Sequence, residues 1–96
     1  MDKKLKFGII GCSSISERST IPAIKKSGFA ELKMIGSRSE TKAKEFAKKN
    51  ECTKFGTYND VFDDNDIDVV YISTPIGTHE ELSIKAAKAG KHVLCE

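Results

Sequence analysis

The 96-residue chain has no tryptophan, only two prolines and no long apolar run. A bilayer-spanning helix needs about 20 consecutive apolar residues, so no membrane span or membrane partner is expected. The apolar stretch from Phe7 to Gly11 is also too short for the core of a secretory signal peptide. We therefore expect a soluble, cytoplasmic protein.

Cysteine is scarce and widely spaced. Cys12, Cys52 and Cys95 are an odd number of residues and form no CxxC pair. This spacing argues against a disulfide framework and against a zinc site. Reduced thiols and no bound metal are expected.

Charge of one sign does not dominate, because the formal net charge is only +2. Residues 1–50 nevertheless carry a net +7, and residues 51–96 a net −5. The basic residues are scattered with few aromatics between them, so no nucleic acid partner is expected. A basic half would attract a phosphorylated ligand, although a solvated lysine-rich helix face explains the charge more simply.

What is present is a regular alternation of strand-like and helix-like segments. Strands are predicted at residues 5–11, 32–36, 54–56, 67–73 and 92–95. Helices are predicted at residues 13–27, 39–50, 58–64 and from 78 or 79 to 89, the first broken or restarted at Pro22, with a loop at 75–77. Ser39 is the predicted cap of the second helix, and Thr57 or Asn59 that of the third. Such connections make the strands parallel and put helices on both faces. The fold class is therefore α/β, a doubly wound parallel sheet of Rossmann type, with about five strands in order 3-2-1-4-5.

The pattern fits one domain over residues 1–96. The sequence stops without a further element after the predicted last strand. Glu96 directly follows the last strand, whose outer edge nothing covers. We expect an incomplete domain of marginal stability in isolation. Self-association through the bare strand edge, or a homo-oligomer, is also expected.

The turn after the first strand partly matches a dinucleotide fingerprint, GxGxxG. Aligned on Gly11, the later positions hold Ser13 and Ser16, which are small enough to remain compatible. A pyrophosphate would lie over the amides of Ser13, Ser14 and Ile15. Taken alone, a turn that binds nothing explains the motif equally well.

The end of the second strand reads Gly36-Ser37-Arg38-Ser39 and contains no acidic residue. An acidic side chain there would bind the ribose 2′-hydroxyl of NAD. Ser37 and Arg38, with Lys42 one turn later, instead suit a 2′-phosphate, which favours NADP over NAD. A solvated loop arginine is the alternative for Arg38.

Thr74-Pro75-Ile76-Gly77-Thr78-His79 follows the fourth strand, beside the point where ligands bind in open α/β sheets. His79 could bond a ribose or a substrate, or be an ordinary histidine at a helix start. Glu96 ends the fifth strand at the same edge. His92 lies at the opposite end of the sheet and is assigned no role.

Together these segments resemble the N-terminal half of the glucose–fructose oxidoreductase, inositol dehydrogenase and MocA family. The resemblance covers nearly the whole chain, and its segments are Phe7–Cys12, Ile21–Ile24, Ser37–Ser39, Asp68–Pro75 with His79, and Ala86–Glu96. The family uses NAD(P) to oxidise or reduce sugars, polyols and related carbonyl compounds. It also has a C-terminal α+β domain that supplies the substrate wall, and this chain lacks it.

The resemblance implies a set of cofactor-binding residues and no catalytic residue within the chain. The cofactor-binding positions are Gly11, Cys12, Ser13, Ser14, Ile15, Ser37, Arg38, Lys42, Thr74, Pro75, Ile76, His79 and Glu96. Glu96 begins the family's Glu-Lys-Pro motif, and the lysine that usually exchanges the substrate proton would be the next residue. The implied function of the intact enzyme is hydride transfer between nicotinamide and a sugar, polyol or keto-sugar.

The chain departs from the family's pattern at three positions. Ser13 stands where the family usually has Gly, Ser16 where it often has Ala, and Ile76 where it usually has Asn. Arg18 with Ile21–Ala23 resembles members that act on nucleotide-linked keto-sugars. Two alternatives remain: a non-catalytic nucleotide-binding module or scaffold, and another Rossmann protein such as a methyltransferase. The methyltransferase is disfavoured because no acidic residue ends the second strand.

Overall fold

The computed structural model describes residues 4–13, 16–74 and 76–95 of the chain. All five strands of its sheet are parallel, in the order β3-β2-β1-β4-β5, which confirms the predicted topology. The strands are β1 (Leu5–Ile10), β2 (Ala30–Gly36), β3 (Phe55–Gly56), β4 (Val69–Ile72) and β5 (His92–Cys95). The helices are α1 (Ile21–Lys26), α2 (Glu40–Lys49), α3 (Tyr58–Asp63) and α4 (His79–Lys88).

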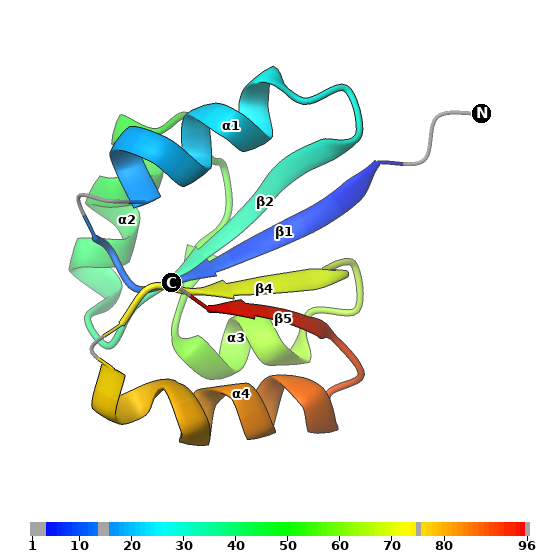
Figure 1. The fold of residues 1–96 in the computed structure, drawn as a ribbon. Helices are drawn as coiled ribbons and strands as arrows, with labels where there is room; N and C mark the ends of the chain where they lie inside the picture. The colour runs from blue at the N-terminus through cyan, green and yellow to red at the C-terminus, as the bar shows by residue number, and fades with distance from the viewer. Residues whose placement is uncertain (1–3, 14–15, 75, 96) are drawn as a thin grey trace.

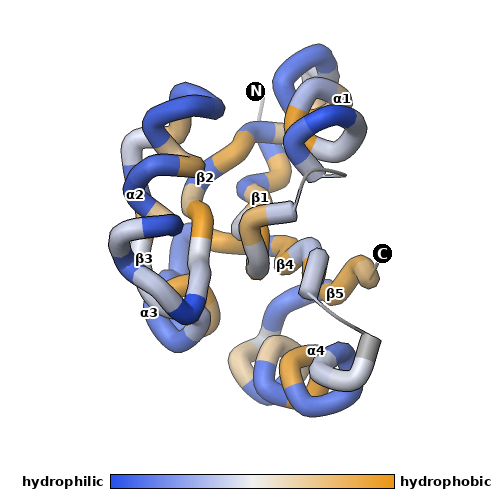
Figure 2. Tube along the Cα trace, turned by 90° about the vertical axis from the view of Figure 1, so that its left-hand side faces the viewer, coloured by the Kyte–Doolittle hydropathy of each residue, from blue (hydrophilic) through white to orange (hydrophobic). Residues whose placement is uncertain are grey.

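Helices cover both faces of the sheet (Figure 1). Adjacent strand residues point to opposite faces, so Ile9 and Ile10, both fully buried, belong to two different cores. Ile9 packs with Ile21 beneath α1 and α2, and Ile10 packs with Val61 beneath α3 and α4. Figure 2 shows the apolar strands enclosed by helices whose outer surfaces are mostly hydrophilic. Two-sided burial explains why the β4 sequence is apolar without alternation.

The helical segment predicted at residues 13–27 consists of two separate elements. A π-helical turn, η1, spans Ser16–Thr20, and α1 follows with Pro22 in its first turn. This confirms that the helix restarts at the proline, which has no amide hydrogen to donate and fits only a helix beginning.

The loop predicted at residues 75–77 was wrong for Ile76 and Gly77. Ile76–Thr78 forms a 3-10 turn, η2, that leads directly into α4. The hydroxyl oxygens of Thr74 and Thr78 lie 2.7 Å apart, and this contact between side chains closes the turn. Propensity alone does not reveal such a contact. Pro75 lies outside the described residues.

Helix caps were predicted more accurately, because they depend on local sequence. Ser39 caps α2 by accepting a hydrogen bond from the Lys42 amide at 3.3 Å. Thr57 and Asp60 form a capping box at the start of α3. These caps fix where α2 and α3 begin, and both beginnings lie at the carboxyl edge of the sheet.

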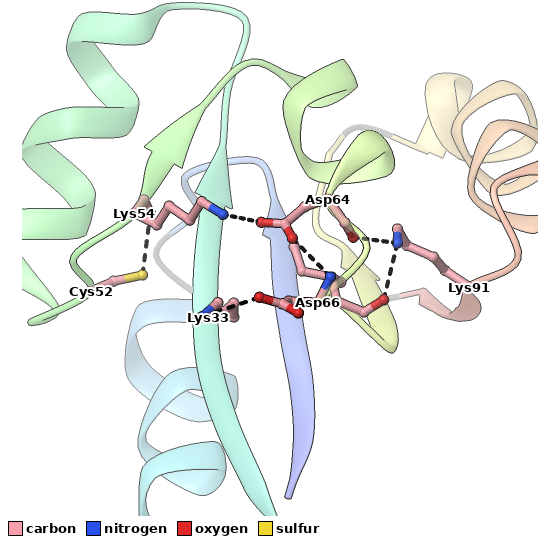
Figure 3. Close-up of polar contacts among 7 residues, drawn as sticks. Lys33, Cys52, Lys54, Asp64, Asp66 and Lys91 are labelled. Atoms are coloured by element: carbon pink, nitrogen blue, oxygen red, sulfur yellow. Dashed lines mark hydrogen bonds and ion pairs between the residues drawn. The ribbon is translucent and has the colours of Figure 1, made fainter.

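A polar network ties together the segments at the opposite, amino-terminal edge of the sheet (Figure 3). Lys54, just before β3, pairs with Asp64, which follows α3. Lys33 of β2 lies 3.9 Å from Asp66. The buried Lys91 donates to the carbonyl oxygens of Asp64 at 2.7 Å and Ile67 at 3.0 Å. The network therefore holds the α3–β4 segment against its neighbours, far from the carboxyl edge.

The Asp64→Asn variant is expected to be less stable than the wild type at neutral pH. The hydrogen bond from Lys54 lowers the pKa of the Asp64 carboxyl below its ordinary value. A lowered pKa stabilises the fold above the unfolded pKa, and this contribution disappears as pH falls through the folded value. The stability difference should therefore shrink in acid. Urea unfolding across pH measures it, with the exposed, neighbouring Asp63→Asn as control; an equal, pH-independent loss in both variants would contradict the argument.

The Lys91→Met variant should lose about 2 kcal/mol of unfolding free energy, because two carbonyl acceptors in the segment between α3 and β4 lose their donor. Methionine keeps the length of the side chain and removes only the ammonium. Lys88→Met is the matched control, since Lys88 is exposed, and a change below about 0.5 kcal/mol is expected there. Denaturant unfolding of the three proteins tests this, and equal losses in both variants would refute it.

Candidate functional site

The strands β1, β2 and β4 end side by side at the carboxyl edge of the sheet (Figure 1). A cleft of about 440 Å³ opens there. It includes the ends of β1 and β4, between which the strand order reverses and open α/β sheets bind ligands. The described residues that line it are Gly11, Cys12, Ser13, Ser37, Arg38, Ser39, Lys42, Tyr58, Ser73, Thr74 and Thr78.

Gly11 makes the turn that leaves β1. Its φ is +101°, a left-handed conformation that side chains disfavour. A Cβ there would lie 2.9 Å from the Ser73 carbonyl oxygen and 3.0 Å from Thr74 Cγ2. The Gly11 amide donates to the Gly36 carbonyl at 2.9 Å, which ties the turn to the end of β2. The first fingerprint glycine is therefore required both by conformation and by close approach to the end of β4.

Three serine hydroxyls meet beside this turn. Ser13 Oγ lies 2.8 Å from Ser16 Oγ and also bonds Ser73 Oγ, and the latter two oxygens are 3.2 Å apart. The Ser16 amide donates to Ser13 Oγ at 3.1 Å. Ser16 is fully buried and Ser73 nearly so. These contacts join the turn after β1 to the end of β4.

The end of β2 supplies a basic corner. Ser37 is buried, its amide donates to the Gly56 carbonyl at 3.0 Å, and its hydroxyl accepts from the Ser39 amide at 3.3 Å. Arg38 and Lys42 are exposed beside it. None of the described lining residues is acidic. The corner can therefore attract a phosphate group, and it offers no carboxylate to a ribose hydroxyl.

Cys12 lies in the cleft wall as a half-buried free thiol. Burial raises its pKa, although a hydrogen bond with Ser37 and the charge of Lys42 act in the opposite direction. The thiol is therefore protonated at neutral pH and is no activated nucleophile. Over the part of the chain that the structure describes, the cysteines are unpaired and no three potential metal ligands gather. In the same part, no helix is both long enough and apolar enough to cross a membrane.

His79, the first residue of α4, is turned toward the backbone. Its Nε2 lies 2.6 Å from the carbonyl oxygen of Thr74. A carbonyl oxygen only accepts, so Nε2 carries the hydrogen of this bond. The ring holds the segment after β4, and only Nδ1 is left to bond a ligand.

Seven of the predicted cofactor-binding residues line the cleft together. They are Gly11, Cys12, Ser13, Ser37, Arg38, Lys42 and Thr74. His79 lies beside the cleft but does not line it. Ser14, Ile15, Pro75 and Glu96 lie outside the described residues. The backbone of Ile76 begins η2, and its side chain is not described.

Four further lining residues were not predicted as site residues: Ser39, Tyr58, Ser73 and Thr78. Tyr58 begins α3, one residue after the short strand β3 has ended. Because parallel strands end at one edge, a residue just after the third strand could have been placed at the site from the sequence. Ser73 directly follows β4 in the same way.

A sequence model of an oxidoreductase family with an NAD-binding Rossmann fold matches residues 5–96. Over 96 residues, the chain is 38% identical to dTDP-3,4-didehydro-2,6-dideoxy-alpha-D-glucose 3-reductase of Saccharopolyspora spinosa. Over 93 residues, it is 39% identical to D-xylose 1-dehydrogenase (NADP(+)) 2 of Haloferax volcanii. The matches cover 100% and 96% of this chain, but only 29% and 28% of those proteins.

Solved structures give the same result. A 3-ketoreductase from Actinomadura kijaniata, solved with NADP, superposes with a TM-score of 0.90 at 32% identity, over 97% of this chain and 30% of that one. Levoglucosan dehydrogenase, solved with NADH and L-sorbose, gives a TM-score of 0.82 at 29% identity, over 97% of this chain and 27% of that one. The chain thus spans less than a third of the length of the proteins it matches.

Proposed function

This chain belongs to the oxidoreductase family with an NAD-binding Rossmann fold, and from that membership we propose that it forms the cofactor-binding part of an NADP-dependent oxidoreductase. Membership of this family excludes the alternative that the chain is part of a methyltransferase. The reaction of the intact enzyme is a hydride transfer between nicotinamide and a sugar, polyol or keto-sugar. These 96 residues match less than a third of the length of the related proteins, so the proposal assigns them cofactor binding and no catalytic residue.

The observation that carries the proposal is the chemistry of the cleft. It joins the bare backbone turn at Gly11 to the basic corner of Arg38 and Lys42, and its described lining contains no carboxylate. A dinucleotide needs close backbone approach at its pyrophosphate, and a 2′-phosphate needs cationic donors at the ribose. Both requirements are met within one cleft at the reversal of strand order. The residues therefore fit NADP better than NAD.

In this arrangement each part of the chain has a distinct task. NADP supplies the hydride-carrying nicotinamide. The turn from Gly11 to Ser13, with Ser14 and Ile15, holds the pyrophosphate. Ser37, Arg38 and Lys42 hold the adenosine end, and Tyr58 forms the wall beside it. The positions that would orient the nicotinamide are Thr74, Pro75, Ile76, His79 and Glu96.

The relatives also favour a class of substrate. Several of them are reductases of dTDP-linked keto-sugars, and the Actinomadura enzyme was also solved with TDP-benzene. We propose a nucleotide-linked keto-sugar as substrate, with Arg18 and Ile21–Ala23 as the part of this chain that suits it.

The compartment and the assembly of the enzyme are also proposed. Unpaired, reduced cysteines are typical of cytoplasmic proteins, so we propose the cytoplasm as the compartment. The outer edge of β5, with half-exposed Leu94, is proposed as a surface for the rest of the enzyme or for a second subunit.

Titration of the chain with NADPH and, separately, with NADH tests the proposal. NADPH is expected to bind at least about tenfold more tightly, since charge-assisted hydrogen bonds to the 2′-phosphate have no counterpart in NADH. Nicotinamide fluorescence or calorimetry gives both dissociation constants. Equal binding of the two would contradict the NADP preference, and binding of neither would contradict the proposed site.

A further inference from the structure

The three-serine cluster of Ser13, Ser16 and Ser73 lies at the turn after β1, where Ser13 occupies the position of the second glycine of the dinucleotide fingerprint. A glycine at that position lets the backbone approach the pyrophosphate. Resting on the proposed NADP site, we propose that Ser16 and Ser73 are positioning residues that hold the Ser13 hydroxyl inside the fold and out of the pyrophosphate's path.

The hydrogen bonds of Ser13 Oγ are fully used. A serine hydroxyl has one hydrogen to donate and two lone pairs to accept with. Ser13 Oγ contacts Ser16 Oγ at 2.8 Å and Ser73 Oγ, and it accepts from the Ser16 amide at 3.1 Å. Three partners match its full capacity, so the hydroxyl has nothing left to offer a phosphate. Ser13 is thus an anchored side chain and not a phosphate ligand.

Burial fixes the direction in which this side chain points. Ser16 has no exposed surface, and Ser73 is 7% exposed. An oxygen bonded to both must face the interior between η1 and the end of β4. The Ser13 amide and the backbone of the turn are then what the cleft presents. Ser16, at the third fingerprint position, and Ser73, outside the fingerprint, are the residues responsible.

Removal of both anchors should weaken cofactor binding. In the Ser16→Ala/Ser73→Ala variant, the Ser13 hydroxyl loses two of its three partners and is free to rotate into the cleft. We expect the NADPH dissociation constant to rise about five- to tenfold, the effect of an unfavourable rotamer or lost clearance at one contact. Titration of the 96-residue chain measures this.

Removal of the Ser13 hydroxyl as well should restore binding. The triple variant, with alanine at positions 13, 16 and 73, keeps the Cβ and lacks only the oxygen that rotates. Its dissociation constant is expected to return to within about twofold of that of Ser13→Ala alone, since both variants lack the oxygen that rotates. If the three serines only stabilised the fold, the triple variant would instead bind NADPH more weakly than the double variant. Weaker binding by Ser13→Ala alone would show that Ser13 is a phosphate ligand and would overturn the inference.

Hydrogen exchange at the Ser16 amide tests the anchoring without any cofactor. Because that amide donates to Ser13 Oγ, its exchange should accelerate at least about tenfold in Ser13→Ala. Unchanged exchange would refute the anchoring. If the wild-type chain binds no NADPH, the proposed function fails; if it binds NADPH and the triple variant is not rescued, only this inference fails.

Discussion

Replacement of Gly11 by alanine is expected to abolish measurable NADPH binding and to destabilise the fold by about 2–4 kcal/mol. The φ of +101° strains any residue with a Cβ. The added carbon would also lie 2.9 Å from the Ser73 carbonyl oxygen. That backbone cannot easily withdraw, because the Ser73 amide is bonded to the Ile10 carbonyl at 2.8 Å. The turn must therefore deform, and the surface offered to the pyrophosphate deforms with it.

Gly28→Ala is the matched control for this substitution. Gly28 follows α1, its φ lies outside the left-handed region, and nothing lies within 4 Å of an added Cβ. A change of at most about 0.5 kcal/mol and unaltered NADPH binding are expected. Thermal unfolding with and without NADPH compares the three proteins. If Gly11→Ala bound NADPH as the wild type does, the turn would not be the pyrophosphate site.

The strand order and the placement of helices on both faces could be predicted from the sequence, because they depend on local periodicity and on a general rule of chain connection. β5 was predicted at residues 92–95 and is observed there. Ser39 was predicted as the cap of α2, and its hydroxyl accepts the Lys42 amide. In each case, residues close together in the sequence determine the result.

The serine cluster could not be predicted, because its members are distant along the chain. Ser13 and Ser73 are 60 positions apart, so no local pattern pairs their hydroxyls. The η2 turn was missed for a different reason, because a contact between the side chains of Thr74 and Thr78 closes a segment that residue propensity assigns to a loop. Tyr58 and Ser73 could have been placed at the cleft, since each follows a parallel strand at its carboxyl end.

Replacement of Arg38 by alanine is expected to raise the NADPH dissociation constant about 10- to 100-fold and to leave NADH binding within about twofold. Arg38 is exposed at the end of β2, next to the buried Ser37 that anchors the loop. Its guanidinium can donate two parallel hydrogen bonds to a phosphate, whereas NADH has only a hydroxyl there. The variant should therefore lose discrimination between the cofactors and not binding in general. Titrations of both cofactors at fixed ionic strength measure the ratio.

The Lys44→Ala variant tests whether NADPH affinity depends on Arg38 itself or on the general positive charge of the N-terminal half. Lys44 is exposed on α2 and does not line the cleft, but its removal lowers the net charge by the same amount as Arg38→Ala. At physiological salt, charges more than about 8 Å apart are largely screened, so Lys44→Ala should leave the NADPH-to-NADH ratio within about twofold of wild type. Equal losses in the two variants would mean that diffuse charge attracts the cofactor. A loss confined to Arg38→Ala would place the 2′-phosphate at the end of β2, where the absence of an acidic residue first indicated it.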